Sequence, residues 1–136
     1  MKNKFLKSLK VLLVEDEEKL SSLLKNAIGD NFKSFFIAKD GLEGLKIYHK
    51  FLPDIIITDI MMPGASGFDL IREIRNINRN AKILSMTGKG GFQNESEAAK
   101  VAKSMNADDI LQKPFEFYVL AMKVQKLLGI KPKTVG

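Results

Sequence analysis

The chain of 136 residues contains no cysteine and no tryptophan, only one histidine and only four prolines. The absence of cysteine excludes disulfide bonds and thiolate metal sites, which is typical of proteins that work in a reducing compartment. No apolar run is long enough for the core of a signal peptide or for a membrane-spanning helix. We therefore expect a cytoplasmic protein that makes no contact with a membrane.

The formal net charge of +6 raises the question of nucleic-acid binding. The excess lies at the two ends, on Lys2, Lys4, Lys7 and Lys10 and on Lys131 and Lys133. Residues 11–130 carry equal numbers of basic and acidic side chains, and neither end alternates aromatic with basic residues as a base-stacking surface does. The charge therefore predicts solvated ends, and we expect no nucleic-acid partner for this chain.

Short apolar runs alternate with stretches of helical periodicity along the whole chain. The expected strands are Val11–Val14, Phe35–Ala38, Ile55–Ile57, Ile83–Met86 and Ile110–Leu111. The expected helices follow them, with apolar faces that include Leu20, Leu23 and Leu24, then Phe68, Ile71 and Ile74, and finally Phe117, Leu120 and Val124. Five strands alternating with five helices predict an α/β fold with a doubly wound parallel sheet.

Polar residues come at the ends of four of these strands. Glu15 and Asp16 follow the first strand, Asp59 ends the third, Thr87 follows the fourth and Lys113 follows the fifth. Parallel strands bring these ends to one edge of the sheet, where such folds place their chemistry. Clustered carboxylates need a cation, and oxygen ligands suit Mg2+, with Mn2+ as the alternative. Carboxylates, a lysine and a hydroxyl around such an ion are the components of phosphoryl transfer, with Asp59 as a candidate nucleophile.

These segments resemble the receiver domain of two-component response regulators. The resemblance rests on Val-Leu-Leu-Val-Glu-Asp-Glu, on Pro-Asp-Ile-Ile-Ile-Thr-Asp-Ile-Met-Met-Pro-Gly-Ala-Ser-Gly, on Met-Thr-Gly and on Ala-Asp-Asp-Ile-Leu-Gln-Lys-Pro-Phe. It covers residues 10–129, and the motifs are specific because they occur together and in order. It implies a flavodoxin-like three-layer sandwich with strand order 2-1-3-4-5.

The resemblance also implies a role for each matching residue. Asp59 is expected to be the phosphoacceptor and, with Asp16, a direct metal ligand, while Glu15 is expected to reach the ion mainly through water. The backbone carbonyl of Met61 is expected to supply another ligand. Thr87 and Lys113 are expected to bind the phosphoryl group. The expected donor is a histidine kinase or a histidine phosphotransfer protein, and the expected output is contact with a downstream protein or a homodimer through the face of the fourth and fifth helices.

Two positions near the site are of special interest. The family commonly has an aromatic switch residue where this chain has Ile110, so the loop and helix after Thr87 are expected to carry part of the signal. Gly88, after the threonine, predicts open access to Asp59, and Lys89 and Met61 lie where relatives tune the lifetime of the acyl phosphate. We therefore treat Gly88, Lys89 and Ile110 as signalling candidates.

The domain division expected from the sequence is a basic extension over residues 1–9, a receiver domain over 10–130 and a short basic tail over 131–136. No output domain is recognised, which favours a stand-alone switch protein rather than an enzyme. A receiver fragment of a larger DNA-binding regulator and a phosphorylation-independent interaction module stay as alternatives. A phosphatase of the haloacid dehalogenase type needs an acid two residues after the nucleophile, and Met61 at that position argues against it.

Overall fold

A computed structural model of the chain describes residues 5–60, 67–88 and 92–130. Its elements alternate as the apolar pattern predicts. The strands are β1 (Lys10–Val14), β2 (Ser34–Ala38), β3 (Ile55–Asp59), β4 (Lys82–Thr87) and β5 (Asp109–Gln112). The helices are α1 (Glu18–Ile28), α2 (Gly41–Phe51), α3 (Gly67–Ile77), α4 (Glu95–Ser104) and α5 (Phe117–Leu127), with single 3-10 turns η1 (Leu6–Ser8) and η2 (Gly29–Asn31).

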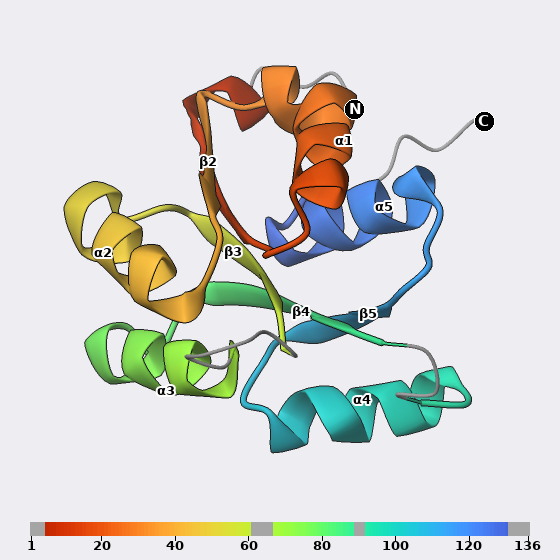
Figure 1. The fold of residues 1–136 in the computed structure, drawn as a ribbon. Helices are drawn as coiled ribbons and strands as arrows, with labels where there is room; N and C mark the ends of the chain where they lie inside the picture. The colour runs from red at the N-terminus through yellow and green to blue at the C-terminus, as the bar shows by residue number, and fades with distance from the viewer. Residues whose placement is uncertain (1–4, 61–66, 89–91, 131–136) are drawn as a thin grey trace.

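The five strands form one parallel sheet in the order β2-β1-β3-β4-β5. Helices α1 and α5 cover one face, and α2, α3 and α4 cover the other (Figure 1). From β1 the chain first adds β2 on one side of the sheet. It then crosses to the other side of β1, where β3, β4 and β5 follow in order. This confirms the doubly wound, flavodoxin-like sandwich and its expected strand order, and it places the switch point between β1 and β3.

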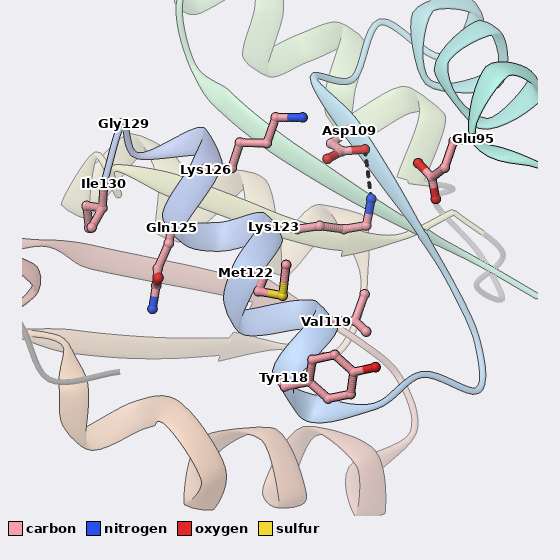
Figure 2. Close-up of a pocket in the computed structure, with 10 residues that line it drawn as sticks. All are labelled: Glu95, Asp109, Tyr118, Val119, Met122, Lys123, Gln125, Lys126, Gly129 and Ile130. Carbon is pink, nitrogen blue, oxygen red and sulfur yellow. Dashed lines mark hydrogen bonds and ion pairs between the residues drawn. The ribbon is translucent and has the colours of Figure 1, made fainter. Parts of the chain in front are cut away.

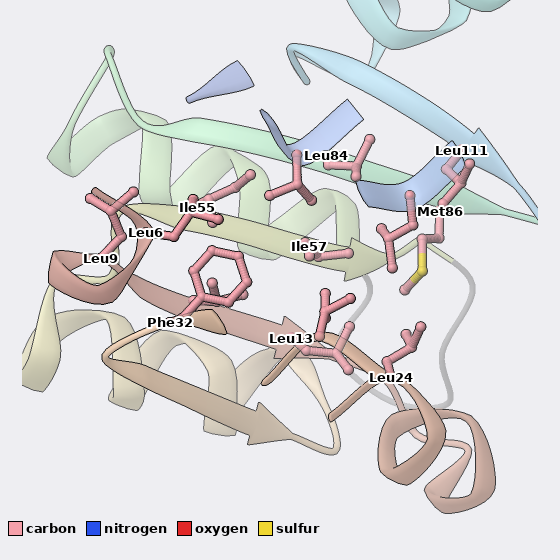
Figure 3. Packing of buried hydrophobic residues seen from close by; sticks show 14 residues of the cluster. Leu6, Leu9, Leu13, Leu24, Phe32, Ile55, Ile57, Leu84, Met86 and Leu111 are labelled. Atoms are coloured by element: carbon pink, nitrogen blue, oxygen red, sulfur yellow. The ribbon is translucent and has the colours of Figure 1, made fainter. Parts of the chain in front are cut away.

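The larger core cluster lies on the face covered by α1 and α5 (Figure 3). Side chains such as Leu13, Ile57 and Met86 come from the strands, and Leu24 and Leu120 come from the two helices. The central strand β3 is buried at every residue, as expected for a strand covered on both faces. The edge of the sheet where β3 ends at Asp59 is therefore supported by a fully buried central strand.

Residues before β1 also belong to this core. Leu6 is fully buried and Leu9 nearly so, and both join the α1–α5 cluster (Figure 3). The backbone N–H of Lys33 donates to the Leu9 carbonyl at 2.9 Å, which ties η1 to the start of β2. Two residues of the extension expected over residues 1–9, Leu6 and Leu9, thus belong to the packed core. The surrounding lysines suggested a solvated segment, but Leu6 and Leu9 fill one end of the core.

Three side chains expected on buried helix faces are exposed. Leu23 on α1, Phe68 on α3 and Phe117 on α5 are 52%, 45% and 43% exposed. On α3, Leu70 takes the buried position next to Ile71 and Ile74. Periodicity correctly locates the helices, but it does not fix the edge of an apolar stripe to within one residue.

Helix ends carry charges that complement the helix dipoles. The first turns of four helices contain acids, at Glu18, Glu43, Asp69 and Glu95, and the last turns contain bases, at Lys25, Lys50, Arg75, Lys103 and Lys126. Asp40, which begins an Asp-Gly-Leu-Glu segment, caps α2 by accepting the Glu43 N–H at 2.8 Å. Within the described ranges, no helix has the length and apolar composition needed to span a membrane.

Candidate functional site

The carboxyl edge of the sheet brings together side chains from four strands. Asp59 is the last residue of β3 and Thr87 the last of β4, while Glu15 and Lys113 directly follow β1 and β5. Asp59 is paired in register with Met86, one residue before Thr87. The Lys113 N–H donates to the Thr87 carbonyl at 2.8 Å, so the β4 and β5 ends are fixed together.

Lys113 connects two of the acidic residues. Its Nζ lies 2.6 Å from Asp59 Oδ2 and also forms a hydrogen-bonded ion pair with Glu15 Oε1. Both carboxyl side chains are more than nine-tenths buried, and that of Lys113 is 21% exposed. The other Glu15 oxygen accepts the Glu17 N–H at 3.0 Å. Glu15 therefore holds Lys113 over Asp59 as well as contributing charge, a relationship that the sequence analysis did not anticipate.

Burial and ion pairing have opposite effects on the pKa of Glu15 and on that of Lys113, and the net result is a raised pKa for both. Burial raises the pKa of the Glu15 carboxyl, and the hydrogen bond from Lys113 opposes that effect only in part. Burial lowers the pKa of Lys113, but its hydrogen bonds to Asp59 and Glu15 outweigh this, so the pKa lies above the ordinary 10.5. Lys113 is consequently protonated and positively charged at neutral pH.

Three carboxylates in this site are close enough to share a cation. One oxygen from each of Glu15, Asp16 and Asp59 lies within 4.8 Å of the others. Glu15 and Asp59 are buried, whereas Asp16 is exposed, so the cluster opens to solvent on the Asp16 side. All three donors are hard oxygens, which fits Mg2+ or Mn2+ and not a thiolate-seeking metal. The residues present thus match the magnesium site of the receiver family.

Thr87 carries a hydroxyl that is buried without a described partner. The residue is 6% exposed, and Thr87 Oγ1 has no hydrogen-bond partner among the described residues. A buried hydroxyl normally finds a partner, because an unpaired one loses the hydrogen bonds it made to water. Thr87 therefore has an unused donor at the site edge.

Gly67 is a site residue whose role sequence reasoning missed. A Cβ at this position would lie 2.3 Å from the Asp59 carbonyl oxygen and 2.9 Å from Ile60 Cα. Only glycine allows the first turn of α3 to approach the end of β3 so closely, and the Gly67 N–H contacts the Ile60 carbonyl at 3.3 Å. The Met-Met-Pro-Gly-Ala-Ser-Gly run predicts a loop, but nothing in it identifies the last glycine as a packing residue.

The remaining candidates are distributed as follows. Met61 and Lys89 lie outside the described residues. Gly88 is exposed, and an added Cβ there would meet nothing within 4 Å. Ile110 is fully buried on β5 and forms a small cluster with Ala98 and Ala102 of α4. The only histidine, His49, is exposed on α2 away from the site edge.

Two hollows flank α5, and one of them includes a site residue, Lys113. One, of about 340 Å³, is lined mainly by apolar residues of α1 and of the β5–α5 connection, including Leu20, Leu23, Phe115 and Phe117, and also by Lys113. The larger, of about 600 Å³, lies between α5, β5 and the start of α4 (Figure 2). Tyr118 and Met122 are exposed there, and Lys123 Nζ pairs with Asp109 Oδ1 at 3.2 Å across it.

Comparison with known proteins gives a consistent result. The model of the response regulator receiver domain matches residues 11–125. The chain is 33% identical over 120 residues to the transcriptional regulatory protein CusR of Escherichia coli K12, covering 88% of this chain and 51% of that protein. It is 32% identical over 106 residues to the chemotaxis protein CheY of Halobacterium salinarum, covering 78% of this chain and 85% of that protein. The chain spans about half the length of most of the curated relatives it matches.

Solved structures agree. A putative response regulator from Chloroflexus aurantiacus superposes with a TM-score of 0.78 at 29% identity, covering 90% of this chain and 99% of that one. The receiver domain of the Francisella response regulator 1452 gives a TM-score of 0.76 at 27% identity, covering 90% and 98%. The fold, the strand-end residues and these matches lead to one conclusion: the chain belongs to the response regulator receiver domain family of two-component systems.

Proposed function

We propose that this chain is a phosphorylatable switch in which Asp59 accepts a phosphoryl group with the help of Mg2+. The observation that carries the proposal is the convergence on Asp59 of Lys113 Nζ, at 2.6 Å, and of the carboxylates of Glu15 and Asp16, within 4.8 Å. This combines a nucleophile, a fixed cation and a set of oxygen ligands for a metal.

The reaction is a transfer between two nucleophiles. An Asp59 carboxylate oxygen attacks the phosphorus of a phosphohistidine, a P–O bond forms, the P–N bond breaks and its electron pair returns to the imidazole. When bound, Mg2+ supplies neutralisation of the negative charge on the phosphoryl oxygens. Lys113, positively charged and held by Glu15, stays beside Asp59 and pairs with the added oxygens. The Thr87 hydroxyl donates to one of them.

The donor is expected at the hollow between α1 and the β5–α5 connection. Leu23 and Phe117 are exposed there beside Lys113, so an apolar helix face of a histidine kinase or phosphotransfer protein would bury them close to Asp59. Exposed apolar residues rimmed by charge are typical of protein-binding surfaces. A downstream protein or a second copy of the chain is expected at the groove lined by Tyr118 and Met122 (Figure 2).

The test is incubation with phosphoramidate or acetyl phosphate and Mg2+, followed by intact mass. We expect a gain of one phosphoryl group in the wild type, no gain in Asp59→Asn and no gain when the metal is chelated. Asp54→Asn is the matched control, because Asp54 accepts the Lys10 N–H at the opposite edge of the sheet and should leave the gain unchanged. No gain in the wild type would favour a phosphorylation-independent interaction module.

A second reading concerns the context of the domain. The chain spans about half of relatives such as CusR and CiaR, which are named as transcriptional regulatory proteins. The same switch would then act within a longer DNA-binding regulator. The length of the native reading frame decides between this reading and a stand-alone receiver.

A further inference from the structure

The seam between α3 and α4 contains a buried hydroxyl that the proposed switch does not use. Ser85, in the middle of β4, is fully buried, and its Oγ has no hydrogen-bond partner among the described residues. Thr58 of β3 and Ile110 of β5 are its register neighbours. The Thr58 hydroxyl donates to the Asp59 carbonyl at 3.0 Å, so it does not serve Ser85.

This seam separates two apolar clusters. On one side, α2 and α3 pack on the sheet through residues that include Ile56, Ile74 and Ile83. On the other side, α4 packs through a small cluster of Ala98, Ala102 and Ile110. Helix α4 makes its main contacts with β5, whereas α2 and α3 also pack against each other. The buried side chains of α4 are two alanines, whereas α3 buries Leu70, Ile71 and Ile74, so α4 contributes less buried apolar area to this face than α3 does.

The register of the sheet connects Ser85 to α4, because its β5 partner, Ile110, is the strand residue on which α4 packs. Side chains two residues apart on a strand share a face, so Ser85 and Thr87 point to the same side of β4. On that side Ser85 lies between Ile83, under α3, and Thr87, at the site edge. The buried, unpaired Ser85 hydroxyl has lost its hydrogen bonds to water. Movement of α4 away from Ile110 would open the strand surface next to Ser85 and let water reach it.

We propose that the unpaired hydroxyl of Ser85 weakens the packing of α4 on the sheet. It thereby lowers the free energy needed to reach a state in which α4 is displaced, and we call this effect the bias. The inference concerns the unmodified domain, and its link to signalling rests on the proposed function. If phosphorylation of Asp59 favours the displaced state, then Ser85 lowers the free energy that phosphorylation must supply.

Amide hydrogen exchange on the unmodified, full-length chain tests the bias directly. Ser85→Ala removes the hydroxyl with little change of shape, and Ser85→Val adds apolar contact and suits a strand. In both variants we expect exchange of the α4 amides, residues 95–104, to slow by about tenfold, as removal of one unpaired buried hydroxyl predicts. The amides of β1 and β3 should exchange at about the same rate in these variants as in the wild type.

Ser21→Ala is the matched control. Ser21 is also a buried serine, but its hydroxyl donates to the Glu18 carbonyl at 3.0 Å, on α1 at the other face of the sheet. We expect α4 exchange in this variant to equal that of the wild type. Unchanged or faster α4 exchange in both Ser85 variants would overturn the proposal.

A second measurement separates this inference from the proposed function. With phosphoramidate and Mg2+, intact mass reports phosphorylation and hydrogen exchange reports α4 in the same samples. We expect phosphorylated wild type to lose protection in α4, and the Ser85 variants to lose less. If the wild type gains no phosphoryl group, the proposed function fails, while slower α4 exchange in the unmodified variants still supports the bias. If phosphorylation occurs but the Ser85 variants match the wild type, the bias alone fails.

Discussion

Lys113 Nζ lies 2.6 Å from Asp59 Oδ2 and is hydrogen-bonded at the same time to Glu15 Oε1. If Asp59 accepts a phosphoryl group as proposed, Lys113 already lies where it can pair with that group. Its charge is also placed beside two of the carboxylates that would hold a metal ion. The same contact that prepares the site for a phosphoryl group must oppose a divalent cation.

The first prediction concerns metal affinity. Lys113→Met removes a positive charge from the carboxylate cluster, so Mg2+ should bind about fivefold more tightly. This corresponds to the loss of roughly 1 kcal/mol of charge repulsion between the lysine and the ion, which solvent partly screens. Mg2+ titration followed by calorimetry measures this. Lys123→Met is the control, because it removes the same charge from the Asp109 pair outside the cluster. Equal affinities for the two variants would contradict the prediction.

The second prediction concerns pH. The pKa of Lys113 is raised on folding above its ordinary 10.5, so the charged lysine stabilises the fold below that pH and the contribution disappears as pH rises through the folded-state pKa. In metal-free protein, the difference in unfolding free energy between wild type and Lys113→Met should be constant from neutral pH upward and shrink above pH 10.5. Urea denaturation across this range measures it. A difference that persists at the alkaline end would show that the charge is not its source.

The third prediction concerns the contact between α3 and β3. Gly67→Ala places a Cβ against the Asp59 carbonyl and the Ile60 backbone, where only backbone movement relieves the overlap. We expect a loss of about 1–3 kcal/mol in unfolding free energy, together with slower phosphorylation because Asp59 is displaced.

Gly88→Ala provides the comparison for Gly67→Ala. The added Cβ meets nothing within 4 Å, so the unfolding free energy should change by less than about 0.5 kcal/mol. Equal stability of the two alanine variants, measured by chemical denaturation, would refute the close-approach argument.

The fourth prediction concerns the opposite edge of the sheet. Arg75 Nη1 donates to the Ala81 carbonyl at 2.6 Å, and Nη2 pairs with Asp108 Oδ2 at 3.0 Å. The same Asp108 oxygen accepts the Ile83 N–H at 2.7 Å, so the guanidinium joins the end of α3 to the starts of β4 and β5. Arg75→Met should lower the unfolding free energy by about 2–3 kcal/mol, because the part-buried Ala81 carbonyl and the Asp108 carboxylate both lose a charged donor.

Arg72→Met tests whether location decides this effect. Arg72 pairs with Asp69 on the same helix, but both side chains are more than half exposed. Such a pair contributes only about 0–1 kcal/mol. Thermal denaturation should therefore separate the two methionine variants clearly, and similar losses would contradict the role assigned to Arg75.

Much of the fold could be predicted from the sequence because its signals are local. The Ile55–Ile57 run before Asp59 and the polar residues at the ends of four strands specify a parallel sheet and a site at one edge. Relationships that depend on three-dimensional approach could not be predicted. The packing of Gly67 on Asp59 is one, and the pairing of Glu15 with Lys113, 98 residues apart, is another.

Other errors came from reading composition as location. The lysines before β1 suggested a solvated extension, yet Leu6 is buried in the core. Leu23 and Phe117 were expected to be buried because they fit the helical periodicity of α1 and α5, but both are exposed beside Lys113 where these helices meet the solvent. The unpaired hydroxyl of Ser85 likewise depends on how the chain packs around β4 and not on its neighbours in sequence.

The polarity of the helix ends has a consequence for how partners meet this domain. Acidic first turns, from Glu18 to Glu95, face the edge that holds Asp59, and basic last turns, such as Lys25 and Lys103, face away from it. Side-chain charges and peptide dipoles therefore point in opposite senses, and the side chains carry the larger charges. These helices therefore carry negative side-chain charge at the end near the site and positive charge at the far end. A partner with basic residues around its histidine would be turned toward Asp59 within about a Debye length, some 8–10 Å, before the surfaces touch.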